Sequence, residues 1–159
     1  MAIQTATGDF NYSDLFFEHK LTDLIDITYK ELSRELHWKT NRLKPGTFGF
    51  DSIACSIGFL LSSKPLPSDI EYGARIVHDA WVRNYLFWSE IKPHVLLPEY
   101  YSHSSKPLVD KRRKMLAITP YFALPENEKE TNRIIVKTVY DYLQINYDKF
   151  QLNEDTFLD

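Results

Sequence analysis

Four side chains with the chemistry of a ligand site stand close together in the chain: His78, Trp81, Arg83 and Tyr85. If this segment is helical, Trp81 and Tyr85 are four residues apart and share a face, whereas Arg83 points elsewhere. An aromatic face can stack on a planar ring, and a base stacked on an aromatic contributes roughly 1–3 kcal/mol. The pattern predicts either a ligand site centred on Trp81 or a packing role for Trp81 in the core, because it lies on the apolar face of its helix.

A run of four basic residues, Lys111-Arg112-Arg113-Lys114, is the second candidate. Arginine forks suit phosphate binding, but such runs also occur as solvated helix faces. Lys129 and Arg133 stand four apart near the expected start of a helix, where positive charge opposes the helix dipole. This placement hints at another partner for them.

The chain shows no motif for catalysis or metal binding. None of its five histidines has His-Glu-x-x-His spacing, and its five glycines form no phosphate loop. Cys55 lies in an apolar run, which is typical of a packing residue rather than a reactive thiolate. We therefore expect no enzyme, no metal and no cofactor.

Composition indicates a globular protein with a core of its own. Of 159 residues, 43% are hydrophobic, 14% are aromatic and 26% are charged, with a formal net charge of −3. A chain of this length buries roughly 68–70% of its unfolded surface. The acidic balance gives no global drive toward nucleic acid, and one cysteine permits no internal disulfide. No signal peptide or membrane-length apolar run is present, so we expect a soluble, cytoplasmic protein without a membrane or nucleic-acid partner.

The first half is expected to be helical. Leu21, Ile25, Tyr29, Leu32 and Leu36 recur at steps of three and four, which predicts a helix over residues 13–38. Residues 1–12 are expected to lie loosely on the surface, and residues 44–46 (Lys-Pro-Gly) to form a turn. A short extended piece at residues 47–50 and a buried helix at residues 51–61, capped by Asp51 or Ser52, complete this half.

The second half begins after the Pro-rich connector at residues 64–67. Ser68 and Glu71 have capping-box spacing and open a helix that must stop before Pro93. The pattern then predicts a loop at residues 92–107, a short helix at residues 108–117 and a final helix at residues 125–145, with Pro125 in its first turn. The expected fold is mainly α with a few short strands. It divides into a helical half (1–64), a second domain (65–150) and a frayed tail (151–159).

Several motifs in the second half occur together in one known family. Ala74, His78 and Trp81 follow an Ala-x-x-x-His-x-x-Trp pattern, and residues 118–124 follow a Leu-x-Pro-Tyr-x-x-Leu stretch, with Ile118 in place of the first leucine. Glu128-Lys129 and Asn132-Arg133 come next in the same order and spacing. Residues 65–147 thus resemble a ryanodine-receptor repeat (RyR) domain, and residues 1–64 show no such pattern.

The resemblance implies binding rather than catalysis. Paired repeats in the channels can hold small ligands between them, and free-standing prokaryotic and viral relatives are suspected of sensing nucleotide-like ligands in host–virus conflict. We therefore expect a small-ligand module, with an adenine-type nucleotide as the model ligand, in which a homodimer or the N-terminal half supplies the second wall. The alternative is a protein–protein interaction module that docks through exposed aromatics. The candidate ligand-binding residues are Trp81, His78, Arg83, Tyr85, Tyr121 and Arg133.

Overall fold

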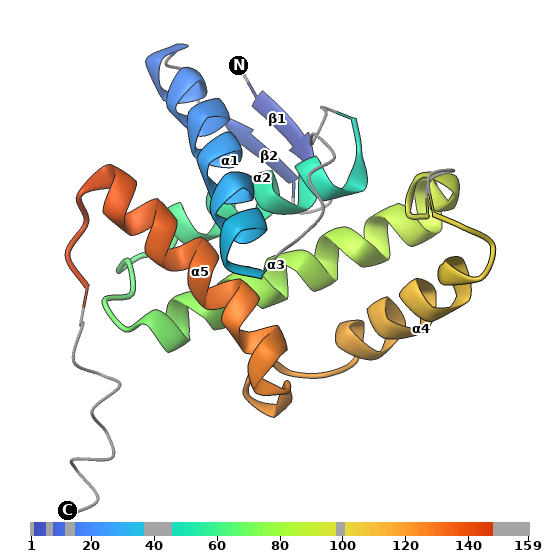
Figure 1. Cartoon of the computed structure of the whole chain (residues 1–159). Coiled ribbons are helices and arrows are strands. Elements are labelled where there is room, and N and C mark those ends of the chain that lie inside the picture. The colour runs from blue at the N-terminus through green and yellow to red at the C-terminus, as the bar shows by residue number, and fades with distance from the viewer. Residues whose placement is uncertain (1, 6–7, 12–14, 37–45, 98–100, 148–159) are drawn as a thin grey trace, which may run out of the picture.

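The computed structural model describes residues 2–5, 8–11, 15–36, 46–97 and 101–147. The protein is mainly α, as the sequence predicted. The helices are α1 (Leu15–Leu36), α2 (Phe48–Leu61), α3 (Ile70–Ile91), α4 (Ser105–Ala117) and α5 (Glu126–Leu143), with short 3₁₀ turns η1 (Pro93–Val95) and η2 (Tyr121–Ala123). In Figure 1, α3 runs beneath α1 and α2, α5 crosses α3, and α4 lies beside the C-terminal part of α3.

The N-terminal segment forms an antiparallel pair of strands, β1 (Ala2–Thr5) and β2 (Gly8–Asn11), in which Ile3 pairs with Phe10. The expectation of a loose surface segment at residues 1–12 differs from this arrangement. The expectation came from composition, which shows only that the segment is polar. Strand pairing depends instead on backbone hydrogen bonds to a neighbouring segment, which composition does not reveal. The expected frayed tail at residues 151–159 lies outside the described residues.

Helix α2 begins earlier than its sequence suggested. Thr47 has an extended backbone, and its side chain accepts a hydrogen bond from the backbone N–H of Phe50, so Thr47 is the N-cap. The expected extended piece at residues 47–50 is therefore wrong, and neither Asp51 nor Ser52 caps the helix. Gly46 precedes the cap with φ of 89°, a left-handed conformation that glycine adopts without strain. Residues 44 and 45 of the expected turn lie outside the described residues.

Helix α3 starts one residue later than expected. Asp69 is its N-cap and accepts from the backbone N–H of Glu71 at 2.9 Å. Ser68 is therefore not the capping residue, and the Glu71 side chain binds Tyr121 and Arg133 instead of completing a capping box. The helix ends at Ile91, before Pro93, as the sequence predicted.

The last two helices have nearly the expected bounds. Helix α4 begins at Ser105 rather than at residue 108, because Pro107 falls in its first turn, where a missing backbone N–H costs nothing. Helix α5 begins after Pro125 and ends at Leu143, since Gln144 adopts a left-handed conformation with φ of 59°.

One hydrophobic core joins the two halves of the chain. Helix α3 approaches α5 so closely that a Cβ on Gly73 would lie 2.9 Å from Cγ1 of Val136. The expected packing of these two helices is confirmed. Leu24 of α1 and Ile57 of α2 belong to the same core cluster, so the segments on either side of residue 64 pack together.

Across the described residues, no helix combines the length and apolar character that crossing a bilayer requires.

Candidate functional site

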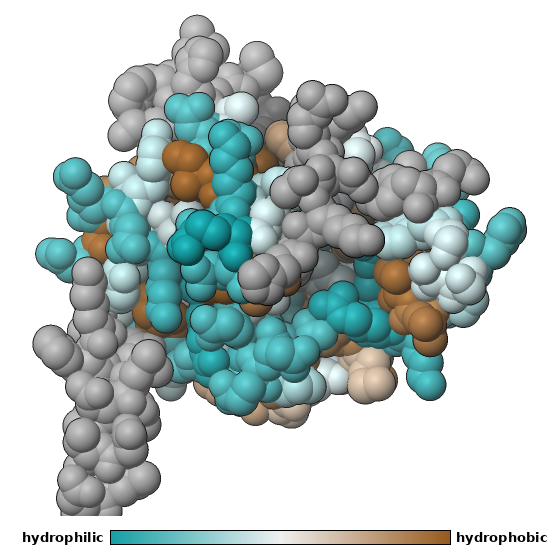
Figure 2. All heavy atoms as spheres, in the orientation of Figure 1, coloured by the Kyte–Doolittle hydropathy of each residue, from teal (hydrophilic) through white to brown (hydrophobic). Residues whose placement is uncertain are grey.

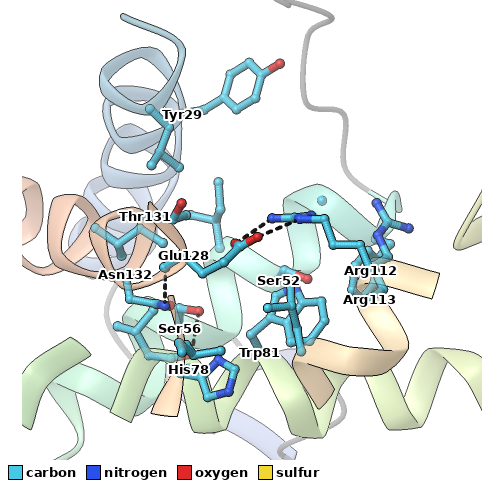
Figure 3. Close-up of a pocket in the computed structure, with 18 residues that line it drawn as sticks. Tyr29, Ser52, Ser56, His78, Trp81, Arg112, Arg113, Glu128, Thr131 and Asn132 are labelled. Carbon is cyan, nitrogen blue, oxygen red and sulfur yellow. Dashed lines mark hydrogen bonds and ion pairs between the residues drawn. The ribbon is translucent and has the colours of Figure 1, made fainter. Parts of the chain in front are cut away.

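A cavity of about 180 Å³ opens where all five helices approach one another. Its lining combines aliphatic and aromatic side chains with polar and charged groups, several of which point into the same space (Figure 3). This combination is typical of small-molecule sites, in which apolar walls bind and a few polar groups orient the ligand. The lining residues are Tyr29, Leu32, Phe48, Gly49, Ser52, Ile53, Ser56, Val77, His78, Trp81, Arg112, Arg113, Leu116, Leu124, Glu128, Thr131, Asn132 and Ile135.

An aromatic ladder on α3 forms one wall. The rings of His78, Trp81 and Tyr85 are nearly parallel: Trp81 lies 6.3 Å from His78 and 5.3 Å from Tyr85, centroid to centroid. Phe48 of α2 meets the edge of Trp81 at 6.1 Å. The 3.6-residue repeat of the helix places the three rings in a row. Trp81 is only partly buried and lines the cavity, whereas Tyr85 is buried behind it.

His78 is held in one tautomer by the backbone. Its Nε2 lies 2.7 Å from the carbonyl oxygen of Thr119. Since a carbonyl oxygen only accepts, Nε2 must carry the proton. This bond ties α3 to the segment before η2 and fixes the imidazole at the cavity wall.

Polar contacts between α2 and α3 hold the wall in place from behind. The indole N–H of Trp88 donates to Asp51 Oδ2 at 2.8 Å, and Asn84 donates to the Ser52 hydroxyl at 3.1 Å. Burial raises the pKa of Asp51, although the hydrogen bonds from Trp88 and Asn84 oppose that rise. Ser52 in turn lines the cavity.

An ion pair between α4 and α5 spans the cavity above Trp81 (Figure 3). Arg112 donates from Nε to Glu128 Oε2 at 2.8 Å and from Nη2 to Glu128 Oε1 at 2.7 Å, a two-point fork. Arg113 donates to the carbonyl of Leu96 and lies 5.0 Å over the Phe48 ring. Both guanidinium groups belong to the basic run and line the cavity.

Tyr121 and Arg133 meet at a second place, around Glu71. The Tyr121 hydroxyl donates to Glu71 Oε1 at 2.9 Å, and Arg133 Nε donates to Glu71 Oε2 at 2.6 Å. Arg133 also pairs with Glu126 at 2.8 Å and with Glu130 at 3.4 Å. Burial opposes the charge of Arg133, but the hydrogen bonds to Glu71 and Glu126 outweigh it and raise its pKa. Burial and Glu71 raise the pKa of Tyr121.

The six residues expected at the site therefore separate into three places. His78 and Trp81 line the cavity, and Tyr85 supports Trp81 from behind. Tyr121 and Arg133 come together in the Glu71 cluster and are not lining residues. Arg83 is exposed, lies 5.4 Å over the ring of Phe59, and takes no part in the cavity.

The sequence did not identify most of the cavity-lining residues that lie outside α3. It noticed Arg112 and Arg113 only as a basic run and Glu128 only as part of a family motif. It found no role for Tyr29 and Leu32 beyond helix periodicity, although both line the cavity. Nothing in their spacing reveals that these segments face Trp81, because the residues come from separate helices.

Comparison with models of known protein families, with curated proteins and with solved structures finds no match for this chain. Within the described residues, no cluster of three or more histidine, cysteine or acidic side chains could hold a metal ion. The geometry of the cavity is therefore the basis for a functional proposal.

Proposed function

We propose that the protein binds a small planar ligand, of the size and kind of a nucleobase, in the cavity beside Trp81, and that it does so without catalysis. The observation that carries this proposal is the position of Trp81: its ring is partly exposed and lines a cavity of about 180 Å³ with mainly apolar walls. Because His78 and Tyr85 stack along the Trp81 ring, a planar ligand would stack on the part of the indole that these two rings leave open to the cavity.

The size of the cavity limits what it can hold. An apolar cavity of about 150 Å³ in another protein accepts a benzene ring. The cavity of about 180 Å³ here is therefore large enough for one planar ring system and too small for a whole nucleotide. Any sugar or phosphate attached to the ring would have to extend toward the mouth, where Arg112 is half exposed.

The second wall comes from within the same chain. Tyr29 of α1 and Phe48, Ser52 and Ile53 of α2 line the cavity together with residues of α3, α4 and α5. If the chain is RyR-like, this N-terminal half takes the place of the second repeat. The site then needs no second copy of the chain, and ligand sensing of the kind suspected in viral and prokaryotic relatives remains part of the proposal.

The test is to compare Trp81→Ala and Trp81→Phe with the natural chain in thermal-shift and titration experiments with nucleosides. We expect the natural chain to be stabilised by mass action, Trp81→Phe to bind more weakly, and Trp81→Ala to bind least. Tyr72→Ala is the matched control, because Tyr72 is an exposed aromatic of the same helix outside the cavity lining. Unchanged binding in a folded Trp81→Phe and Trp81→Ala, or no binding by the natural chain, would overturn the proposal.

A second candidate is a protein-interaction surface around Tyr72 and Phe122. These two exposed rings meet edge to face at 6.2 Å, and Ile118, four residues before Phe122, is 83% exposed. Aromatics exposed in this way can dock a partner, including a second copy of the chain. On the face shown in Figure 2, however, the apolar side chains form separate small groups within a hydrophilic surface.

Light scattering over a range of concentrations discriminates this candidate. If the surface mediates a homodimer, the natural chain should dimerise, and the double variant Tyr72→Ser with Phe122→Ser should remain monomeric. Dimerisation that survives the double variant would place the interface elsewhere, and Trp81→Phe should have no effect on it.

A further inference from the structure

The charged residues of the cavity lining favour an anionic ligand. They are Arg112, Arg113 and Glu128, two guanidinium groups against one carboxylate, so their formal charges sum to +1. A ligand that brings a negative group to this wall gains attraction, and a cation meets net repulsion. The charge is concentrated on the α4 side of the cavity (Figure 3).

Arg112 is the member of this set that can change partner. Its side chain is 53% exposed, whereas that of Glu128 is 14% exposed, so solvent anions reach the arginine first. Its contact with Glu128 is a two-point fork, so only an anion that can accept both bonds would displace the carboxylate. Helix α4, all of which the structure describes, has no buried residue and packs against the core through the half-buried Leu116 and Ala117.

Glu128 would not be left without a partner by such an exchange. A carboxylate this well covered needs hydrogen bonds when it loses its cation. It lines the cavity that holds the ring in the proposed function, where ring N–H groups can donate to it. A ligand with N–H donors on its ring and an anionic group beyond the ring would give Glu128 and Arg112 each a new partner: the ring N–H groups would donate to Glu128, and the anion would accept from Arg112.

We propose that Arg112 is the specificity-determining residue for a ligand made of a planar, N–H-bearing ring with an attached phosphate monoester. The ring occupies the cavity against Trp81, and the phosphate replaces Glu128 as the partner of the Arg112 fork. The two-point geometry that Arg112 now makes with a carboxylate also suits two phosphate oxygens. This inference rests on the proposed function and adds the anion and the residue that recognises it.

The experiment compares nucleosides with their monophosphates, namely adenosine with AMP and guanosine with GMP, by calorimetric titration. The readout is the ratio of the two dissociation constants, which cancels what the ring alone contributes. For the natural chain we expect the monophosphate to bind roughly tenfold tighter or more, the scale of hydrogen bonds to a charged group. Arg112→Met should reduce the ratio to about one, and Arg112→Lys, which keeps the charge without the fork, should give an intermediate ratio.

Two further variants make the test specific. Glu128→Gln removes the competing carboxylate, so the ratio should rise above that of the natural chain. Arg83→Met is the matched control: it removes a guanidinium from the helix of Trp81, outside the cavity lining, and should leave the ratio unchanged. Circular dichroism confirms that each variant is folded.

The outcomes separate the two proposals. If nucleosides bind and Trp81→Phe weakens them, but the ratio is one or is unaffected by Arg112→Met and Arg112→Lys, the role of Arg112 is refuted and the proposed function stands. If neither nucleosides nor monophosphates bind, both proposals fail. Equal loss of the ratio in Arg83→Met would also refute the assignment, since it would show a general charge effect.

Discussion

The substitution Gly73→Ala tests the close approach of α3 to α5, on which the geometry of the cavity depends. Helix α3 carries Trp81 and α5 carries Glu128, so their separation sets the width of the site. An added Cβ at Gly73 would lie 2.9 Å from Cγ1 and 3.3 Å from Cγ2 of Val136, and 3.5 Å from Cδ1 of Leu60. The first distance is shorter than real carbon contacts allow, so something must move.

Two opposing terms decide the sign of the effect. Alanine is favoured over glycine inside a helix by about 1 kcal/mol. Against this, overpacking a close-fitting core costs about 1–3 kcal/mol. Val136 is fully buried and β-branched, and valine in a helix has one strongly preferred rotamer, so it cannot turn away. We therefore expect a net loss of about 1 kcal/mol, or about 2–4 °C in melting temperature for a chain of this size.

Urea denaturation followed by far-UV circular dichroism measures this loss. The control is a double-mutant cycle with Val136→Ala, which leaves a cavity in the natural background. The methyl group that Gly73→Ala adds would partly fill that cavity, so the double variant should be more stable than the sum of the single effects predicts. If Gly73→Ala instead stabilises the protein by about 1 kcal/mol, as at an exposed helical glycine, the close approach of the helices is refuted.

Three further predictions concern single contacts. Burial raises the pKa of Asp51, so the native state holds this proton more tightly than the unfolded chain and loses stability as pH rises from about 3.9 through the higher native pKa. Asp51→Asn keeps an acceptor for Trp88, and its stability relative to the natural chain should increase between pH 3.5 and 7 in chemical denaturation. A constant or falling difference would contradict the burial of a charged Asp51. Arg133→Met leaves Glu71 beside other carboxylates and should cost about 2–3 kcal/mol, since both partners are only partly exposed. Arg133→Met combined with Glu71→Met should cost much less, and equal losses in thermal unfolding would show that the unpaired Glu71 carboxylate is not the source of the cost. Asp69→Ala should lower the free energy of unfolding by about 1 kcal/mol, because α3 loses its N-cap, whereas Asp69→Asn should lower it by only a few tenths of a kcal/mol. Equal stability of the two variants in urea unfolding would exclude a capping role.

The sequence alone was enough to locate the main helices. The apolar repeat of three and four residues identified α1, α3 and α5, because that repeat follows directly from 3.6 residues per turn. Pro93 predicted the end of α3 because proline disfavours helical backbone just before it. The same repeat put His78, Trp81 and Tyr85 on one face of α3, where the structure has them.

Helix starts were predicted less well, for a local reason. Ser68 and Asp69 are neighbours and both are good capping residues, so residue type does not choose between them. The structure chooses Asp69. Likewise, Asp51 and Ser52 were plausible caps for α2, but Thr47 lies next to the left-handed Gly46, which turns the chain into the helix one turn earlier.

What the sequence determined by itself is thus the set of local elements and the face that each side chain takes within its helix. Which faces meet was decided by tertiary packing alone. Arg112 and Glu128 stand 16 residues apart, and Tyr121 and Glu71 stand 50 apart, yet each pair is in hydrogen-bond contact. Helical periodicity fixes the direction of a side chain only within its own helix, because beyond a loop the orientation of the next helix depends on burying its apolar stripe against the others. The partners of Arg112, Tyr121 and Arg133, and the cavity beside Trp81, exist only because the stripes of α1, α2, α3 and α5 share one core, against which α4 packs through the half-buried Leu116.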